Sequence, residues 1–281
     1  MYIFNFYTYL TGKAEEFYKL PRKLKEEEIN KIKNEKEMNN FKKEKLEKLA
    51  KQNWDKFYLR NSDKFYKDRE WTQLDFVKYL PDAFDSSVNL RYLEIGCGVG
   101  NMLFPIMKQF NHWTFYAFDF SKNAINLLNK RIRESNYDKE KVNVFVGDLT
   151  DHEFCWLYSF VDLITAIFVL SSIHPEKLTV AIKNLKKCLK PGGTVIVRDY
   201  GIYDYAMLRF GRNSKIAERF YARQDGTRTF YFMLDELIDI FSSEGFRIAK
   251  SEYLTPIKMI EHKQVSMERV FVQATFILTS A

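Results

Sequence analysis

The sequence contains few of the residues that build disulfide frameworks or metal sites. Its three cysteines, Cys97, Cys155 and Cys188, are odd in number and widely spaced along the 281 residues. The four histidines form no metal-ligand pattern with these cysteines. We therefore expect neither a disulfide framework nor a metal site, and we interpret Cys97 as a packing residue rather than a nucleophile.

Long apolar runs are also missing from the sequence. No stretch reaches the roughly 18 consecutive apolar residues that a membrane-spanning helix needs. Residues 1–10 are apolar and aromatic, but this stretch is too short for a secretory signal and lacks its basic start and cleavage site. We expect a protein without membrane contact in a reducing intracellular compartment, in the cytoplasm or also in the nucleus.

The chain does contain enough apolar residues for a sizeable core. Hydrophobic residues make up 46% of the sequence, and the length suits one α/β domain with an appended segment. The 44 basic and 37 acidic side chains give a net charge of +7. This moderately basic balance is suggestive of a polyanionic partner, although an ordinary solvated surface explains it equally well.

The most informative segment is the sequence Arg-Tyr-Leu-Glu-Ile-Gly-Cys-Gly-Val-Gly-Asn at residues 91–101. Together with the residues that follow, it predicts a strand, a glycine turn, a helix and a second strand that ends at Asp119. Gly96, Gly98 and Gly100 lack the Cβ atoms that would keep a ligand away from the backbone. An acid about 20 residues after such a turn can accept hydrogen bonds from ribose hydroxyls, which predicts a nucleoside-binding βαβ unit.

The glycine spacing indicates which nucleoside this unit binds. Dinucleotide folds use G-x-G-x-x-G and place a pyrophosphate at the helix N-terminus. This chain has G-x-G-x-G preceded by Glu94, with no basic residue in the turn. An acid there suits the cationic amino-acid tail of S-adenosylmethionine better than the phosphates of NAD. We therefore expect S-adenosylmethionine, because a turn that only joined strand to helix would leave Asp119 unexplained.

The chain divides into three parts. Residues 1–47 form a charged N-terminal arm rich in Lys and Glu, which we interpret as a solvated helix or a partly disordered tether. Residues 48–89 carry aromatic side chains at helical spacing among charges, so this helical segment must pack on another part of the protein. Residues 90–281 form the nucleoside-binding domain.

Strands and helices alternate regularly in the third part. Periodicity predicts strands at 91–95, 113–118, 142–146, 161–167 and 194–198, helices at 101–110, 122–134, 175–189 and 235–243, and closing strands at 246–254 and 268–279. This alternation predicts an α/β fold with a doubly wound, mainly parallel Rossmann-like sheet. The fold would carry an N-terminal helical segment and an insertion after the fifth strand.

Ligands of such sheets bind at the carboxyl ends of the strands. The glycine turn, Asp119, Asp148 and Ile167 end neighbouring strands, so we expect them to face one crevice. Asp148 could accept a hydrogen bond from an adenine amino group, although capping of a helix is the alternative. Leu149 and Ile167 would sandwich the adenine ring.

Two aromatic side chains precede this domain. Trp54 and Tyr58 lie one helical turn apart and so face the same way. We expect them to cover the cofactor as a lid, with ordinary packing of their helix on the sheet as the alternative.

The segment after the fifth strand is the candidate for substrate binding. Residues 198–231 contain six arginines, one lysine, four acids and eight aromatics. Such a mixture suits a single-stranded nucleic acid, since Arg and Lys contact phosphates while exposed bases stack on rings. A charged surface loop with buried tyrosines is the alternative. Arg209, Arg223 and Arg228 are the candidate substrate contacts in this insertion.

Six motifs carry a resemblance to a known family. They are Asn-Trp-Asp-Lys-Phe-Tyr at 53–58, Phe-Tyr-Lys-Asp-Arg at 65–69 with Trp71, Leu-Glu-Ile-Gly-Cys-Gly-Val-Gly-Asn at 93–101, Phe-Val-Leu-Ser at 168–171 with His174 and Pro175, Arg-Asp-Tyr-Gly at 198–201, and Arg-Gln-Asp-Gly-Thr-Arg at 223–228. These resemble the motifs of the tRNA 3-methylcytidine methyltransferases, which are class I S-adenosylmethionine-dependent enzymes acting on the anticodon loop. The last two motifs are far more discriminating than the glycine turn. Residues 1–40 match no family motif.

The resemblance implies a set of contacts and partners. The implied cofactor contacts are Trp54, Tyr58, Gly96, Asp119, Asp148, Leu149 and Ile167. Arg69, within the second motif, is added as a substrate contact. The compact C-terminus resembles the family branch that methylates the cytidine at tRNA position 32 in serine tRNAs and works with seryl-tRNA synthetase.

The expected reaction needs positioning more than acid or base chemistry, because N3 of cytidine carries an available lone pair. N3 lies on the pairing edge, so the base must be unpaired or flipped out. Arg198, Asp199 and Tyr200, at the carboxyl end of the fifth strand, are the candidate catalytic residues, and Asp199 would stabilise the cationic product ring. A methyltransferase of a small molecule or protein, and an inactive adaptor for tRNA or a synthetase, are the alternatives.

Overall fold

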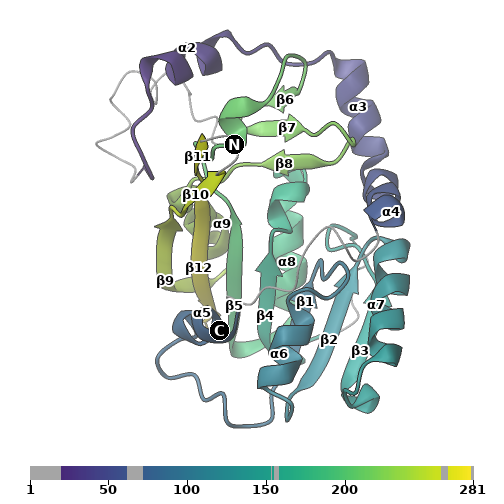
Figure 1. The fold of residues 1–281 in the computed structure, drawn as a ribbon. Coiled ribbons are helices and arrows are strands. Elements are labelled where there is room, and N and C mark those ends of the chain that lie inside the picture. Colours follow the sequence, from purple (N-terminus) through teal and green to yellow (C-terminus); the bar gives the residue numbers. More distant parts are fainter. Residues whose placement is uncertain (1–19, 62–71, 153, 155–157, 261–264, 280–281) are drawn as a thin grey trace.

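The computed structural model of the chain describes residues 20–61, 72–152, 154, 158–260 and 265–279. At its centre lies a seven-stranded sheet with the order β3-β2-β1-β4-β5-β12-β9 (Figure 1). Its strands are β1 (Arg91–Ile95), β2 (Thr114–Asp119), β3 (Val142–Val146), β4 (Val161–Ile167), β5 (Leu189–Tyr200), β9 (Phe246–Leu254) and β12 (Phe271–Leu278). The first five are parallel, and β12 runs antiparallel between β5 and β9. The predicted doubly wound, mainly parallel sheet is confirmed.

Helices cover both faces of this sheet (Figure 1). They are α5 (Thr72–Tyr79), α6 (Leu103–Gln109) and α7 (Lys122–Glu134) on one face, and α8 (Leu178–Cys188) and α9 (Leu234–Ser243) on the other. Helix α7 spans the predicted residues because Ala124, Ile125, Leu128 and Ile132 form one buried stripe. Each face of the sheet therefore has its own hydrophobic core, which the helices cover.

The starts of two elements differ from the sequence prediction. Helix α8 begins at Leu178, after the short 3₁₀ turn η4 (Pro175–Lys177), whose proline stands at the first helical position. Strand β5 begins at Leu189 instead of residue 194, because Leu189 already pairs with Val161 of β4. Since the register between β4 and β5 then shifts, the Pro-Gly-Gly sequence is accommodated within the strand.

A second layer lies over the carboxyl ends of the parallel strands (Figure 1). It contains α2 (Glu26–Asn34), α3 (Asn40–Lys48) and α4 (Ala50–Asn61) from the N-terminal part, the turns η3 (Leu170–Ser172) and η5 (Met207–Arg209), a three-stranded sheet of β6 (Lys215–Ala217), β7 (Phe220–Ala222) and β8 (Arg228–Phe230), and the hairpin β10 (Ile257–Ile260) with β11 (Val265–Glu268). The insertion after β5 therefore has a small sheet of its own.

The described part of the N-terminal arm packs against this insertion. The backbone amide of Met38 donates to Lys215 O at 2.8 Å, and the hydroxyl of Tyr221 donates to Glu35 at 2.7 Å. Ile32 is buried in a cluster that includes Tyr221 and Tyr231 of the insertion. Residues 26–48 are thus mostly helical and are held to the insertion along their length.

The aromatic side chains of the insertion fill its interior. Tyr203, Phe220, Tyr221, Phe230 and Tyr231 are buried. For these rings the structure agrees with the alternative of buried side chains, and not with rings on which bases stack. Tyr203, Tyr221 and Tyr231 form a cluster with Ile32 of the N-terminal arm, whereas Phe220 and Phe230 pack into the core on the α8 and α9 face of the large sheet.

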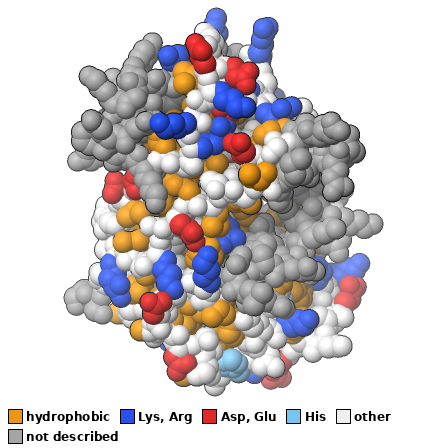
Figure 2. Space-filling view, turned by 60° about the vertical axis from the view of Figure 1, so that its left-hand side comes forward, with side chains coloured by type: hydrophobic (Ala, Val, Ile, Leu, Met, Phe, Trp, Pro, Cys, Tyr) orange, Lys and Arg blue, Asp and Glu red, His pale blue; other side chains and the backbone are white. Residues whose placement is uncertain are grey.

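Figure 2 shows one face of the molecule, turned by 60° from the view of Figure 1. Among the described side chains on this face, basic and acidic groups are interspersed, with hydrophobic groups between them. The positive net charge is therefore not gathered into a single patch on this side. No helix among the described residues is long and apolar enough to cross a membrane.

Candidate active site

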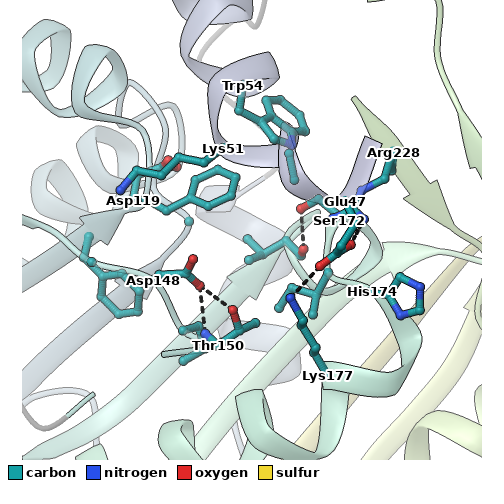
Figure 3. A pocket seen from close by; sticks show the side chains of 18 of the residues that line it. Glu47, Lys51, Trp54, Asp119, Asp148, Thr150, Ser172, His174, Lys177 and Arg228 are labelled. Carbon is teal, nitrogen blue, oxygen red and sulfur yellow. Dashed lines mark hydrogen bonds and ion pairs between the residues drawn. The ribbon is translucent and has the colours of Figure 1, made fainter. Parts of the chain in front are cut away.

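A cavity of about 290 Å³ opens at the carboxyl ends of the parallel strands (Figure 3). Its floor comes from the residues that follow β1, β2, β3 and β4, and its roof comes from α3 and α4. Residues of η4 and β8 form the remaining wall. The cavity therefore joins strand ends to segments that are distant in sequence.

Asp119 is a buried hydrogen-bond acceptor that lines this cavity. Its Oδ2 accepts a hydrogen bond from the backbone amide of Gly98 at 3.0 Å, and its Oδ1 accepts from the amide of Ser121 at 2.8 Å. Burial raises the pKa of Asp119 to about 6, although both amides act in the opposite direction. The sequence prediction that this acid ends β2 and faces the cavity agrees with its position.

Asp148 closes a local turn at the edge of the cavity. Its Oδ1 accepts hydrogen bonds from the backbone amide and hydroxyl of Thr150, at 2.8 and 2.7 Å, and so closes a local turn. The residue also lines the cavity together with Leu149 (Figure 3). Ile167 lies elsewhere, in a smaller neighbouring cavity. Leu149 and Ile167 thus do not enclose a common space, and Phe118 and Phe120 supply aromatic lining that the sequence analysis missed.

The three glycines of the turn have different reasons to be glycine. A Cβ on Gly96 would lie 2.5 Å from Val169, and one on Gly98 would lie 2.6 Å from the hydroxyl of Tyr58. Both residues border a cavity and have positive φ angles. Gly100 borders neither cavity, and its close neighbours are Leu128 and Phe104. Its small size therefore serves packing of the turn on α6 and α7.

Trp54 and Tyr58 line both cavities from the roof. Their ring centroids lie 6.0 Å apart, as expected for one helical turn. Their helix α4 is fastened to α7, because Asp55 accepts hydrogen bonds from the hydroxyl of Ser121 at 2.5 Å and from the amide of Asn123 at 3.2 Å. The sequence analysis missed this role of Asp55, which lies within one of the family motifs.

The smaller cavity, of about 70 Å³, adjoins the larger one. Both are lined by Trp54, Tyr58, Gly96, Phe168 and Ser172. The smaller cavity alone is lined by Glu94, Cys97, Gly98, Asn101, Ile167, Ser171, Tyr200 and Arg223, among others. The two spaces therefore meet beneath the roof.

Phe168 stands at the junction of the two cavities with φ at 59°, an unusual conformation for a residue with a side chain. This conformation directs its ring to within 4.9 Å of the Tyr200 ring. The pattern Phe-Val-Leu-Ser was noted in the sequence, but backbone strain cannot be read from sequence.

Asp199 lies behind the wall of the smaller cavity. It is fully buried and lines neither cavity. Its two oxygens accept hydrogen bonds from the backbone amides of Ser171, at 2.9 Å, and Tyr200, at 2.8 Å. Burial raises the pKa of Asp199 to about 6, against the effect of these hydrogen bonds. The carboxylate therefore shapes the wall rather than facing the space within it.

The candidate arginines are spread over several places. Arg223 lines the smaller cavity, with its guanidinium 5.6 Å from the centre of the Tyr200 ring. Arg198 and Arg209 line neither cavity. The former donates to Gln273 at 2.5 Å, and the latter is exposed beside Tyr205.

Arg228 and Arg69 are the remaining predicted arginines. Arg228 lines the larger cavity and is paired with Glu47 of α3. Arg69, with its motif, lies outside the described residues. No cluster of three or more His, Cys, Asp or Glu side chains suited to a metal ion occurs in the described ranges.

Comparison with known proteins identifies the family. Residues 93–195 match the family described as a methyltransferase domain. The human tRNA N(3)-cytidine methyltransferase METTL6 is 40% identical over 259 residues, which cover 91% of this chain and 90% of that protein. The chain belongs to the tRNA N(3)-cytidine methyltransferases. The zebrafish (Danio rerio) tRNA N(3)-cytidine methyltransferase METTL2 is 40% identical over 195 residues, which cover 68% of this chain and 54% of that protein.

Solved structures agree on the fold of this methyltransferase. A SAM-dependent methyltransferase from Methanosarcina mazei superimposes with a TM-score of 0.56 at 17% identity, covering 74% of this chain and 98% of that one. The class I methyltransferase fold and the resemblance noted in the sequence are thereby confirmed. S-adenosylmethionine is the cofactor of this methyltransferase.

We expect Gly98→Ala to weaken binding of S-adenosylhomocysteine by at least about tenfold, or about 1.4 kcal/mol. The new Cβ would meet the Tyr58 hydroxyl at 2.6 Å, and Tyr58 is a buried residue that lines both cavities, so a shift of its ring changes their shape. Calorimetric titration of the purified variant measures the affinity.

Gly192→Ala is the matched control for this experiment. Gly192 also has a positive φ, of 78°, but a Cβ there has no atom within 4 Å. This variant should lose some stability to backbone strain and keep wild-type affinity. Equal affinities of Gly98→Ala and the wild type would show that the turn does not fix Tyr58.

Proposed function

We propose that this chain transfers the methyl group of S-adenosylmethionine to N3 of a cytidine in the anticodon loop of a tRNA. The observation that carries this proposal is the similarity to METTL6 over nearly the whole length of both chains. A domain match alone would support only methyl transfer, because one fold serves many substrates. The two adjoining cavities provide separate spaces for a donor and an acceptor.

The donor occupies the larger cavity in this proposal. Asp119 accepts hydrogen bonds from the ribose hydroxyls, and Asp148 accepts one from the adenine amino group. Glu94, at the end of β1 beside the smaller cavity, offers a negative charge to the amino-acid tail. Trp54 and Tyr58 cover the donor and exclude water from it. These roles agree with the positions of the five residues in the structure.

The acceptor base occupies the side of the smaller cavity that Phe168, Tyr200 and Arg223 line, next to the amino-acid tail of the donor at Glu94. Phe168 and Tyr200 present aromatic surfaces there, on which a flipped pyrimidine can stack. The Arg223 guanidinium offers hydrogen-bond donors to the carbonyl oxygen of the base. N3 already carries a lone pair, so the site has only to hold it in line with the methyl group. A strong general base is therefore not required.

Asp199 acts on this acceptor space through the backbone. Its carboxylate holds the amides of Ser171 and Tyr200, two residues that line the smaller cavity. We therefore assign it a positioning role, in place of the direct contact with the base that the sequence suggested. Arg198 faces Gln273 and Tyr79 instead, and contributes to the packing of β5.

The serine tRNAs are the proposed substrates within this class. METTL6 is matched over 90% of its length, whereas METTL2 is matched over 54%. This length agreement favours the METTL6-like branch, and with it a seryl-tRNA synthetase partner and a cytoplasmic location. The specificity would depend on contacts outside the two cavities.

The direct test of the function is the position of a labelled methyl group. Purified protein is incubated with tRNA and methyl-labelled S-adenosylmethionine, and the tRNA is digested to nucleosides for mass spectrometry. We expect label only in 3-methylcytidine, more in serine tRNAs than in threonine tRNAs, and none in a serine tRNA whose anticodon-loop cytidine is replaced by uridine. Label on another nucleoside would overturn the substrate assignment.

We expect Asp199→Asn to keep wild-type affinity for S-adenosylhomocysteine and to lower the single-turnover rate by about 10- to 100-fold. The amide nitrogen of asparagine cannot accept, so one backbone amide loses its partner at a cost of about 1–3 kcal/mol. Rapid-quench measurement with tRNA gives the rate. Asp138→Asn, at an exposed cap far from the cavities, should react like the wild type. An unchanged rate in Asp199→Asn would refute the positioning role.

Donor affinity should fall as the pH drops below about 6. The ribose hydroxyls need the ionised form of Asp119, and burial holds its pKa in the free protein near this value. The limiting slope is about tenfold per pH unit, because one proton is displaced. Above about pH 7 the affinity should level off. Titrations between pH 5 and 8 measure this profile.

The stability of the fold should depend on pH with the opposite sign to donor affinity. A carboxyl whose pKa is raised by folding stabilises the fold when protonated, and this contribution is lost as the pH rises through its folded pKa, about 6 for Asp119. Asp119→Asn should remove this contribution and flatten the affinity profile. A steep profile that persists in Asp119→Asn would assign the titration to another group.

A further inference from the structure

Glu47 bridges two cations at the rim of the larger cavity (Figure 3). Its Oε1 lies 2.5 Å from the ammonium of Lys177 on η4, and its Oε2 is paired with the guanidinium of Arg228 on β8. The three residues come from three separate elements. This one carboxylate therefore ties the N-terminal helices both to the nucleoside-binding domain and to the inserted sheet.

The bridge matters electrostatically because Arg228 is buried. Only 6% of its side chain is exposed, so without Glu47 its charge would lack its main counter-charge. Lys177 would add a repulsive positive charge nearby. Glu47 also stands in the last turn of α3, where an acid is unfavourable to the helix dipole. The two cations offset this local disadvantage.

The position of Glu47 determines what the bridge controls. Helix α3 ends at Lys48, and α4 begins two residues later with Ala50. Lys48, Ala50, Lys51 and Trp54 all line the larger cavity, so they form its roof directly after the bridge. A shift of α3 would carry these residues away from the strand ends.

A second contact fixes the roof to the same inserted sheet. The side-chain amide of Asn53 donates to Gly226 O at 2.9 Å. Gly226 lies in the turn before β8, two residues from Arg228. The roof is therefore fastened at two points, through Asn53 to the β7–β8 turn and through Glu47 to the first residue of β8, and only the contact of Glu47 depends on charge.

We propose that Glu47 is a positioning residue that holds the roof closed over the donor, and that Arg228 and Lys177 serve this closure rather than contacting RNA phosphates. The inference rests on the proposed function only in placing the donor in the larger cavity. It reassigns Arg228, which the sequence had suggested as a substrate contact.

The test compares donor affinity among variants of the full chain. Calorimetry with S-adenosylhomocysteine should give a Kd about tenfold higher for Glu47→Gln and for Arg228→Met than for the wild type. Lys177→Met, which leaves Arg228 paired, should have a smaller effect in the same direction. Lys43→Met, also on α3, removes the pair between Lys43 and Glu37 away from the cavity, and this variant should bind like the wild type.

Two further readouts separate closure from general structural damage. With saturating donor, kcat of Glu47→Gln should stay within about threefold of the wild type, while the donor KM rises. The double variant Glu47→Gln with Arg228→Met should lose less affinity than the two single losses combined, because both remove one interaction. Binding of tRNA should be unchanged in Arg228→Met.

Several results would overturn the inference. Wild-type donor affinity in Glu47→Gln and Lys177→Met would show that the bridge does not hold the roof. Weakened tRNA binding in Arg228→Met with unchanged donor affinity would return Arg228 to the substrate contacts. If Glu47→Gln fails to fold, Lys177→Met decides alone. A wild-type protein that binds no S-adenosylhomocysteine would instead overturn the proposed donor site.

Discussion

Hydrogen bonds to the buried carboxylate of Asp119 connect the parts from which the donor site is built. The carboxylate accepts from Gly98 in the glycine turn and from Ser121 at the start of α7. The Ser121 hydroxyl in turn donates to Asp55 of the roof helix. Turn, sheet, helix and roof are therefore joined through one chain of polar contacts. A buried carboxylate needs such partners, so the fold positions this proposed ribose acceptor before a donor binds.

The strand ends that line the larger cavity were predictable from the sequence, because they follow directly from the alternation of strands and helices. Asp119 ends β2 and Asp148 follows the end of β3, so both had to lie at the same edge of the sheet. Contacts between distant segments were not readable in this way. Glu47 belongs to a run of Lys and Glu that looked like a solvated arm, and only the fold brings it beside Arg228. The burial of Asp199 behind Ser171 depends equally on packing between β4 and β5.

The insertion after β5 shows why residue type alone is a weak guide to a substrate surface. Its mixture of arginines and aromatics predicted stacking and phosphate contacts, yet five of its rings are buried in two hydrophobic clusters that it shares with the large sheet and the N-terminal arm. Arg228 neutralises Glu47, whereas Arg223 does reach the smaller cavity. An inserted segment must bury most of its aromatic side chains in order to fold against the rest of the protein. Only the rings that stay partly exposed can meet a ligand.

The proposed reaction requires the donor to lie in the larger cavity, with its reactive end toward the smaller one. A crystal structure of the protein with S-adenosylhomocysteine tests this arrangement most directly. It should show the ribose hydroxyls on Asp119, the adenine amino group on Asp148, and the sulfur beside the space bounded by Phe168 and Tyr200. A nucleoside bound elsewhere, or a cavity filled by the side chains of Trp54 and Tyr58, would contradict it.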